Sequence, residues 1–439
     1  MKILKVIHGY PPAYNAGSEV YSQTLCNALS KSHEVHVFTR EENPFLPDYS
    51  FRSEQDSLQP KVTKHLVNIP LLRQRYRYQH EGIDNSFEGL FQKIKPDVVH
   101  IGHLNHLSIS LLEKAKDIPI IFTLHDYWLL CPRGQFVQRN SKDTEEIWKA
   151  CEGQENRKCA EKCYSGYFSG VSSEWEEDVS YWTRWVERRQ SHLKKIMELV
   201  DVFIAPSQYL LNRFKNDANL PDSKLIYLDY GFDHSRFKER SRLKESEFVF
   251  GYIGTHTPQK GIHLLIKAFG RVKGNCILRI WGRYRSEITA GLKQLVSTLP
   301  KDIQARVEWR PEYSNTEITS QVFNHVDVVV VPSLWVENSP LVIHEAQQMG
   351  IPVITANMGG MSEFVKHEEN GLLFDFREEE SLAIQMQRLL DNPELAKKLG
   401  ERRYLHTSRG DIPDIKDHVE EIEKIYLDLL VKKGRNPQL

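Results

Sequence analysis

The segment from Val328 to Ala346 constrains this chain more than any other part of its sequence. It starts with four consecutive valines, continues through Pro332-Ser333, and reaches Pro340 just before a helical pattern. An apolar β-branched run is typical of a buried parallel strand, and proline suits the first turn of a helix because its missing N–H would be unpaired there anyway. The segment therefore predicts a strand, a polar loop and a helix N-terminus.

A helix N-terminus at this place suits an anionic group. Its free N–H groups and partial positive charge favour a nucleotide phosphate. Glu337 and Glu345 flank the same place, with seven residues between them. The position of two carboxylates beside a phosphate is explained if they accept hydrogen bonds from the hydroxyls of a sugar and a ribose. The alternative is a loop glutamate and a surface-helix glutamate that share no ligand.

The spacing of these glutamates resembles the signature of retaining glycosyltransferases of family 4, which have the GT-B fold. The likeness rests on Glu337, seven residues and Glu345-Ala346, after a hydrophobic strand that ends in Pro332-Ser333. It implies an α/β protein of two Rossmann-like, doubly wound domains that face a central cleft. In that family the first glutamate and the backbone after it contact the donor sugar, and the second glutamate binds the ribose hydroxyls. The resemblance thus implies a donor site that includes Glu337, Asn338, Ser339, Pro340, Leu341 and Glu345, with Glu337 also catalytic.

The length of 439 residues predicts two domains of about 200 residues each. We expect an N-terminal acceptor domain at 1–238 with an insertion at about 128–180, and a nucleotide-sugar donor domain at 239–412. A helix within 413–439 is expected to pack back on the first domain, as in GT-B proteins.

Composition and charge exclude several classes of function. The formal net charge is −1, so no overall charge attracts nucleic acid, and no nucleic acid partner is expected. The N-terminus becomes polar too early for a secretory signal, and no run of about 18 apolar residues occurs. The expected compartment is the cytoplasm, where the six cysteines would stay reduced.

A second strand–loop–helix unit opens the chain. Residues 1–8 predict a strand, Gly17 lets the backbone approach a ligand closely, and Ser18 is expected to cap a helix from Val20 to Ser30. Family members usually carry two glycines in this loop, near donor phosphate and acceptor, so the resemblance implies that Gly17 contacts the donor. The alternative is a plain turn.

Histidines follow several predicted strands of the first domain. Strands that alternate with helices form a parallel sheet whose ligand lies at the carboxyl ends of the strands. Four positions fall at such ends: His8, His100, His103 and His125-Asp126. Residues 123–128 also resemble the family's strand-end histidine segment, which implies that His125 lies beside the transferred sugar with a catalytic role. Whether it acts as base, acid or hydrogen-bond donor stays open. Acceptor contacts are predicted at His103, Asp126 and Trp128.

The second domain begins with a strand that ends in Gly254 and leads to Lys260. The charge of this lysine can neutralise a diphosphate that becomes more negative as its sugar leaves. In the family the lysine works with an arginine directly after the glycine, a place that Thr255 holds here. The second positive charge is missing or comes from one of three nearby side chains: His256, Arg283 and Arg285. The expected donor contacts are Gly254, Thr255 and Lys260, with Lys260 also catalytic. Residues 310–313 resemble the place where the family binds the nucleobase, so Arg310 is expected there.

Four cysteines gather in the insertion that follows His125-Asp126. They are Cys131, Cys151, Cys159 and Cys163. Clustered thiols in a reducing compartment predict a structural zinc that holds a long loop together and shapes the acceptor pocket. Free thiols and disulfides remain the alternatives, because the spacing is not that of paired Cys-x-x-Cys motifs.

Two basic segments could meet an anionic partner. Residues 64–80 interleave arginine with tyrosine, and a helical pattern from Tyr181 to Val200 carries a basic face. Both are compatible with a lipid-linked acceptor or with peripheral contact at the inner face of a membrane, and equally with an ordinary solvated surface.

Together with these observations, the resemblance implies a retaining glycosyltransferase that moves a sugar from a UDP- or GDP-sugar to a hydroxyl of a glycan or lipid-linked acceptor. Surface polysaccharide or glycolipid biosynthesis is the expected setting. No catalytic cofactor is expected, since no Asp-x-Asp segment is present to hold a divalent metal. The alternatives are a nucleotide-sugar epimerase or hydrolase of the same fold and a silent scaffold that binds nucleotide or glycan, which Thr255 alone favours.

Overall fold

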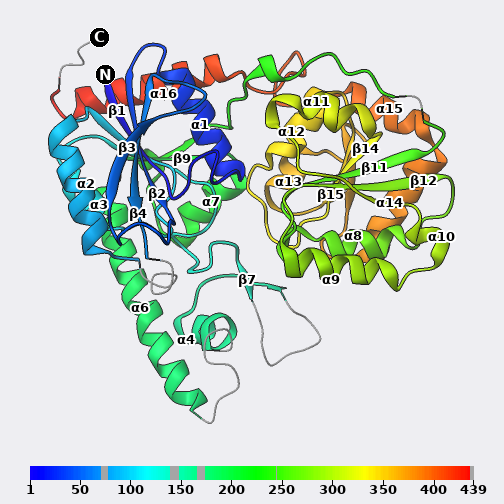
Figure 1. Ribbon diagram of the computed structural model, residues 1–439, viewed down its shortest axis with the longest axis horizontal. Coiled ribbons are helices and arrows are strands. Elements are labelled where there is room, and N and C mark those ends of the chain that lie inside the picture. Colours follow the sequence, from blue (N-terminus) through cyan, green and yellow to red (C-terminus); the bar gives the residue numbers. More distant parts are fainter. Residues whose placement is uncertain (71–77, 139–147, 166–173, 244, 436–439) are drawn as a thin grey trace.

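The structure is a computed structural model and describes residues 1–70, 78–138, 148–165, 174–243 and 245–435. Two β-sheets stand side by side, each with helices on both faces (Figure 1). All strand pairs in these two sheets are parallel except the pair β3–β4 in the first sheet. The predicted pair of doubly wound, Rossmann-like α/β sheets is confirmed.

The first sheet has the strand order β10-β9-β6-β5-β1-β2-β4-β3. Its strands are β1 (Lys2–Val6), β2 (Glu34–Glu41), β3 (Phe51–Gln55), β4 (Val62–Asn68), β5 (Val98–Ile101), β6 (Ile120–Thr123), β9 (Val202–Ala205) and β10 (Leu225–Tyr227). Its helices include α1 (Gly17–Leu29), α2 (Glu81–Ile94), α3 (Leu111–Lys114) and α7 (Gln208–Asp217). The order of strands reverses at β1, so the crevice between β1 and β5 is the natural place for a ligand.

Details of the first sheet concern two sequence predictions. In the basic segment 64–80, residues 71–77 lie outside the described residues, and β4 occupies the first residues and pairs with the antiparallel strand β3. β3 is polar and mostly exposed, so it carries no hydrophobic signal. Ser18 does not cap α1: the helix begins one residue earlier, and the Ser18 hydroxyl donates to Glu19 Oε2 at 2.8 Å from within the first turn.

The second sheet has the order β13-β12-β11-β14-β15-β16. Its strands are β11 (Phe248–Ile253), β12 (Cys276–Trp281), β13 (Val307–Trp309), β14 (Val328–Val331), β15 (Val353–Ala356) and β16 (Gly371–Phe374). Its helices are α8 (Ile262–Phe269), α9 (Ser286–Ser297), α10 (Lys301–Gln304), α11 (Ile318–Gln321), α12 (Leu341–Gln348), α13 (Gly359–Phe364), α14 (Glu379–Asp391) and α15 (Pro393–Glu401). The four valines of β14 are buried, as a central parallel strand requires. The order of strands in this sheet reverses between β11 and β14, the two strands whose following loops carry Lys260 and Glu337.

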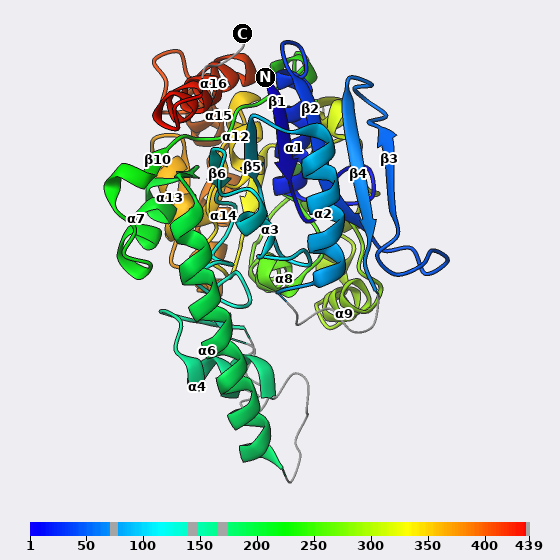
Figure 2. The same cartoon turned by 90° about the vertical axis from the view of Figure 1, so that its left-hand side faces the viewer.

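An arm leaves the first domain between β6 and β9 (Figures 1 and 2). Its described elements are β7 (Val137–Gln138), β8 (Lys149–Ala150), α4 (Asn156–Cys159), a π-helical turn at Ala160–Ser165, and the long helix α6 (Trp175–Leu199). One end of α6 packs on the sheet and the other projects away from it. A separate apolar cluster holds this outer end together, with the rings of Tyr164 and Trp182 stacked at a centroid distance of 5.0 Å.

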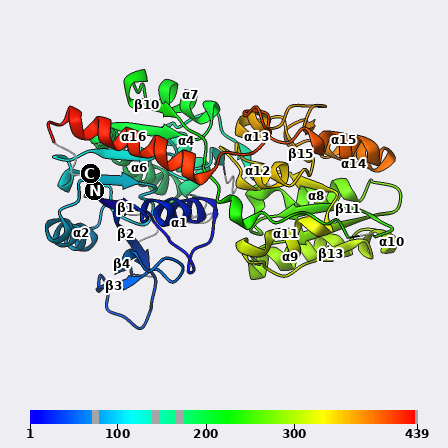
Figure 3. The same ribbon diagram turned by 90° about the horizontal axis from the view of Figure 1, so that it is seen from above.

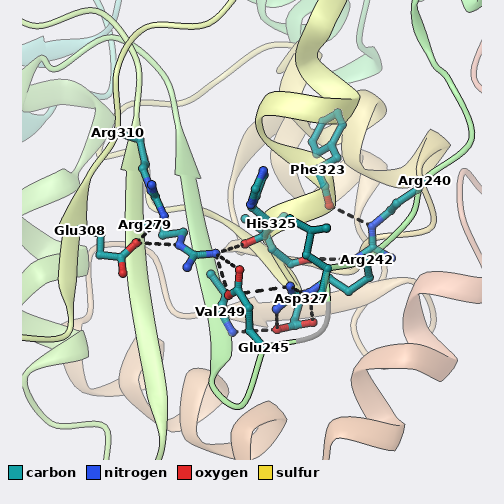
Figure 4. A network of polar contacts seen from close by, with 12 residues as sticks. Arg240, Arg242, Glu245, Val249, Arg279, Glu308, Arg310, Phe323, His325 and Asp327 are labelled. Carbon is teal, nitrogen blue, oxygen red and sulfur yellow. Dashed lines mark hydrogen bonds and ion pairs between the residues drawn. The ribbon is translucent and has the colours of Figure 1, made fainter.

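The linker between the two sheets is fixed by a network of guanidinium groups (Figure 4). Arg242 forms two hydrogen bonds of 2.8 Å with the carboxylate of Asp327, which also accepts from Val249 N at 2.8 Å. Arg240 donates to two carbonyls that lie just before β14. These contacts tie the linker to the amino end of the second sheet, opposite the edge that bears Lys260 and Glu337.

The last helix, α16 (Ile415–Lys432), returns to the first domain (Figure 3). His418 Nε2 lies 2.8 Å from the hydroxyl of Tyr21 on α1, and the Tyr426 hydroxyl lies 2.6 Å from His100 Nδ1. His100 is fully buried by this contact and also meets Thr123, so it packs the sheet rather than a ligand site.

Candidate functional site

A cleft of about 470 Å³ lies between the carboxyl edges of the two sheets. It is lined by most of the residues that the sequence singled out, namely Gly17, His103, His125, Asp126, Gly254, Thr255, Lys260, Glu337, Asn338, Ser339, Pro340, Leu341 and Glu345. Two predicted members are not among its lining residues. The guanidinium of Arg310 binds Glu308 at 2.7 Å, and Trp128 borders a small neighbouring hollow with His103 and His125.

Glu337 is held at the centre of the cleft by three donors to one oxygen. Ser333 Oγ, Trp335 Nε1 and Lys260 Nζ reach its Oε1 at 2.6, 2.8 and 2.7 Å. Its side chain is only 6% exposed, so this carboxylate is fixed in place rather than mobile in solvent. In the part of the chain that the structure describes, no side chain or backbone group is recorded on Oε2, which leaves that oxygen able to accept from a ligand hydroxyl.

Three glycines allow the loop that carries Glu337 to lie where it does. Gly261 has φ +71°, and a Cβ there would stand 1.9 Å from the carbonyl oxygen of Pro332. Gly359 has φ +61°, and a Cβ on Gly360 would stand 1.3 Å from the carbonyl oxygen of Asn338. Gly360 N also donates to Glu337 O at 2.9 Å. Sequence reasoning did not connect Gly359 and Gly360 to the glutamate loop, because they lie in a separate segment of the chain.

The loop after Glu337 is anchored by the first domain. The Asn338 side chain accepts from Ser207 Oγ at 2.7 Å, and Ser339 Oγ donates to Asp229 at 2.9 Å. These two side chains are therefore occupied by domain contacts, and the backbone of the loop is what faces a ligand.

Helix α12 presents its N-terminus to the cleft. Pro340 is its N-cap, and among the described residues no side chain accepts a hydrogen bond from the first N–H groups. A Cβ on Gly17 would stand 3.5 Å from Leu341, so the start of α1 lies against the start of α12. Two helix N-termini thus approach one place, which favours an anion there.

Glu345 on α12 has a partner that sequence reasoning missed. Arg236 Nη2 donates to its Oε1, and both side chains are mostly buried. Arg236 lies in the linker, stacked 4.7 Å from the ring centre of Phe237. Nothing in the sequence marked this arginine, because a basic residue in a polar linker is unremarkable by itself.

His125 on the first-domain side is held by Tyr230, whose hydroxyl lies 2.6 Å from Nδ1. Burial, followed by the nearby Lys5 and His103, lowers the pKa of His125 well below its usual value. The imidazole is therefore neutral near pH 7 and a poor proton acceptor. Its Nε2 is buried without a hydrogen-bond partner among the described residues. This geometry favours a hydrogen bond to a ligand over removal of a proton.

Two carboxylates border the cleft near His125. Asn105 N donates to His103 Nδ1 at 2.9 Å, so His103 Nε2 carries a proton that it shares with both oxygens of Asp126 at 3.2 Å. Glu19 lies 3.3 Å from His8 Nε2. Burial would raise the pKa of Glu19, but hydrogen bonds from His8 and Ser18 outweigh it and lower the pKa to about 2. Glu19 was missed because an acid in the first turn of a helix is common for other reasons.

The arm is joined to this wall through Arg189 on α6. Its guanidinium is 4.5 Å from the ring centre of Trp128, and Nη2 donates to Trp128 O at 2.6 Å. Arg189 is 1% exposed, and burial lowers its pKa. The residues after Asp126 are thus fixed by the root of the arm.

The four clustered cysteines are thiols in the structure. Burial and the nearby Cys131, Cys163 and Cys151 raise the pKa of Cys159 to about 12, so without a metal this residue is a neutral thiol. Among the described residues, no group of three or more His, Cys, Asp or Glu side chains is arranged to hold a metal ion. The zinc site at these four cysteines stays a prediction.

A larger hollow of about 970 Å³ lies at the opposite edge of the second sheet, beside the linker and α15. It mixes acidic and basic side chains that pair with one another, as Arg242 does with Asp327. Nothing in it selects a ligand, and the cleft between the sheets remains the candidate site. No helix in the described ranges is long and apolar enough to cross a membrane.

Comparisons with known proteins show the family to which the chain belongs. The family description "Glycosyltransferase Family 4" matches residues 16–236, and "Glycosyl transferases group 1" matches residues 233–406. A Methanocaldococcus jannaschii protein named uncharacterized glycosyltransferase MJ1607 is 23% identical over 402 residues, which is 89% of this chain and 90% of that protein. The Escherichia coli UDP-Gal:alpha-D-GlcNAc-diphosphoundecaprenol alpha-1,3-galactosyltransferase is 27% identical over 203 residues, 44% of this chain and 48% of that enzyme.

Solved structures share the whole architecture. Sucrose-phosphate synthase from Thermosynechococcus elongatus superposes with a TM-score of 0.71 at 18% identity, over 98% of this chain and 99% of that one. Anabaena Alr3699/HepE in complex with UDP and glucose superposes with a TM-score of 0.63 at 17% identity, over 98% and 100%. At these identities the likeness shows the fold, and it confirms the predicted GT-B arrangement.

Proposed function

The chain belongs to the family 4 glycosyltransferases of GT-B fold, and on that premise we propose that it transfers a sugar, with retention, from a nucleoside diphosphate sugar to a hydroxyl of a glycan or lipid-linked acceptor. The observation that carries the proposal is the arrangement of Glu337, Lys260 and the uncapped N-terminus of α12 in one cleft. A sugar diphosphate needs three kinds of group: carboxylates that accept hydrogen bonds from its hydroxyls, a cation and free N–H groups.

In this proposal the diphosphate lies at the N-terminus of α12 beside Lys260. As the bond from the sugar C1 to the diphosphate oxygen breaks, negative charge develops on the leaving group, and both groups stabilise it. The acceptor oxygen bonds to C1, and its proton passes to the departing diphosphate oxygen. Glu337 accepts a hydrogen bond from a hydroxyl of the donor sugar, and Glu345 accepts from the ribose.

The acceptor lies on the first-domain side of the cleft. His125 Nε2 hydrogen-bonds the transferred sugar, and Asp126, held by His103, accepts from the acceptor hydroxyl. Trp128 supports this wall of the cleft, and Arg189 holds its backbone and ring in place. Gly17, Gly254 and Thr255 line the donor side through their backbones.

Relatives guide the choice of substrates to test. HepE was solved with UDP and with glucose, and the Escherichia coli relative is named for a UDP-sugar and a diphosphoundecaprenol acceptor. We therefore rank UDP-sugars ahead of GDP-sugars and place the acceptor among glycans or lipid-linked sugars of surface polysaccharide or glycolipid biosynthesis. No metal cofactor is proposed for the transfer.

The outward face of α6 supports a peripheral contact with an anionic membrane surface. Arg184, Arg188 and Lys195 are exposed on it, and none has an ion pair with another described residue. Each unpaired cation near such a surface adds to the attraction. We expect the protein to sediment with vesicles of phosphatidylglycerol but not phosphatidylcholine, and a triple change of these residues to glutamine to abolish this. Equal sedimentation of wild type and the triple variant with phosphatidylglycerol vesicles would contradict the proposal.

The direct test of the transferase is calorimetry with nucleoside diphosphates and nucleotide sugars, in EDTA and then with added magnesium. We expect one nucleotide class to bind without metal and Lys260→Ala to lose most of that affinity. Glu337→Ala should reduce transfer to a lipid extract far more than it reduces binding of the free nucleoside diphosphate. A nucleotide sugar split with water, or returned as an epimer, would support the alternative enzymes. Binding without any turnover would support the scaffold.

A further inference from the structure

We propose that Arg283 supplies the second positive charge for the donor diphosphate, in place of the cation that Thr255 cannot provide. The inference rests on the proposed function and concerns the same cleft, in which Arg283, Thr255 and Lys260 are all lining residues. Its basis is the position of Arg283 beside Thr255 and the weakness of the partner that now holds it.

Thr255 and Arg283 hold corresponding places on neighbouring strands. β11 and β12 pair in parallel with Ile253 opposite Trp281, so each residue lies two positions beyond that pair. The two chains stay together past the strand ends, because Gly254 N donates to Trp281 O at 3.2 Å and His256 N donates to Arg283 O at 3.0 Å. Neighbouring strands are about 4.8 Å apart, a shift that an arginine side chain spans easily.

Gly282 makes this close approach feasible. It has φ +130°, and a Cβ at this position would stand 2.0 Å from the carbonyl oxygen of Gly254. The loop that carries Arg283 therefore packs directly against the loop that begins the diphosphate site. A cation one strand away from position 255 still faces the same part of the cleft.

The charge of Arg283 is available, whereas that of Lys260 is already balanced. Lys260 Nζ lies 2.7 Å from Glu337, whose side chain is 6% exposed. Arg283 Nε lies 3.2 Å from Glu312, whose side chain is 54% exposed. Exposed pairs contribute little to stability, so Arg283 can exchange Glu312 for a phosphate at small cost. A diphosphate that met Lys260 alone would share it with a buried carboxylate.

The other two basic side chains near Thr255 do not fit the task. His256 is fully buried with Nδ1 3.0 Å from Thr289 Oγ1, and burial with the nearby charge of Lys293 lowers its pKa to about 4, so it is neutral near pH 7. Arg285 is exposed at the start of α9 and does not line the cleft. Arg285 therefore serves as a matched control.

The test compares Arg283→Gln with Arg285→Gln in calorimetric titrations of the nucleoside diphosphate that wild type binds best and of its parent nucleoside. We expect Arg283→Gln to weaken the diphosphate roughly 10- to 100-fold, as the loss of a charge-assisted hydrogen bond does, and to leave the nucleoside unchanged. Arg285→Gln should match wild type for both ligands. Arg283→Lys should retain part of the affinity.

A second variant moves the charge rather than removing it. Thr255→Arg in the Arg283→Gln background restores a cation on the neighbouring strand, so it should recover most of the lost diphosphate affinity. Recovery in the double variant would also show that the loss in Arg283→Gln comes from the missing charge at this part of the cleft.

Two outcomes would overturn the inference while the proposed function stands. One is diphosphate affinity of Arg283→Gln within about twofold of wild type, and the other is an equal loss for the nucleoside, which would make Arg283 a base contact. Failure of wild type to bind any nucleoside diphosphate would instead remove the proposed function and the inference with it.

Discussion

Glu345 illustrates how one side chain can serve a ligand and the protein together. Arg236 holds its Oε1, so the carboxylate is oriented before any ribose arrives. We predict that Glu345→Gln weakens the preferred nucleoside diphosphate roughly tenfold, because the amide replaces one acceptor with a donor and loses the ion pair. The measurement compares the affinities of the ribonucleoside diphosphate and its 2′,3′-dideoxy analogue for wild type and for Glu345→Gln. Wild type should prefer the ribonucleotide, and Glu345→Gln should not. A preference that survives the substitution would show that Glu345 does not bind the ribose.

His125 gives a prediction about pH at the same scale. Burial keeps its pKa well below the usual value, so the imidazole stays neutral as pH falls from 8 to 6. The Tyr230 hydroxyl beside it does not ionise either, because burial raises its pKa well above 10. Transfer measured at saturating donor should therefore show no limb with a pKa near 6.5. Such a limb, present in wild type and absent in His125→Asn, would assign proton transfer to His125 instead.

Single residues differed in how far sequence could place them. Glu337, Glu345 and Lys260 were found because a strand, a loop and a helix start fix their spacing within one short segment each. Arg236 and Glu19 were not found, because their roles depend on contacts across the domain junction and with His8. Arg283 was one of three candidates, and the structure separates it from the others through the pairing of β11 with β12, the burial of His256 and the position of Arg285 outside the cleft.

At the scale of elements, the start of α13 and the Glu337 loop depend on each other. A Cβ on Gly360 would overlap the carbonyl of Asn338. Because the overlap is with backbone atoms, Gly360→Ala must displace the backbone of the loop. We predict that this variant loses donor binding by at least about tenfold while its circular dichroism spectrum keeps the native helix content. Gly291→Ala on α9 is the control, since nothing lies within 4 Å of its Cβ, and alanine there should stabilise by about 0.5–1 kcal/mol. Full donor affinity in Gly360→Ala would contradict the coupling.

Elements were predicted best where apolar residues are buried on both sides. The strands of the second sheet follow this pattern, and β14 with its four valines is the clearest case. β3 and β4 were missed because β3 is an exposed, polar edge strand and β4 contains Thr63, Lys64 and His65. The zinc site at the cysteines of the arm stays a prediction, because spacing in sequence does not specify how four side chains converge.

The whole molecule is held in its present domain arrangement by a buried polar junction around Asp229. This carboxylate accepts from His344 Nε2 at 2.8 Å, from the Tyr404 hydroxyl at 2.7 Å and from Ser339 Oγ at 2.9 Å. His344 Nδ1 also lies 3.1 Å from Pro340 O, the N-cap of α12. The junction thus connects the end of the first sheet to the helix that begins at the anion site.

This junction makes stability depend on pH with a defined sign. Burial alone would lower the pKa of His344, but the charge and hydrogen bond of Asp229 outweigh it, so the pKa is raised above 6.5. A raised pKa means that the stabilisation from charged His344 is fully present below about 6.5 and is lost as pH rises through the folded value. Burial would raise the pKa of Asp229, but His344, Tyr404 and Ser339 lower it, so its contribution is lost only in acid below about 3.8.

We therefore predict that His344→Gln lowers the melting temperature more at pH 5.5 than at pH 8.5. Tyr404→Phe is the matched control. It removes a hydrogen bond to the same carboxylate, but burial and the charge of Asp229 hold the pKa of Tyr404 far above 10, so its effect should be equal at both pH values. Each variant should cost roughly 1–3 kcal/mol at its maximum, as expected for a buried hydrogen bond to a charged group. An effect of His344→Gln that is the same at both pH values would show that the imidazole is neutral in the folded protein, and the junction would then be an ordinary hydrogen-bonded contact.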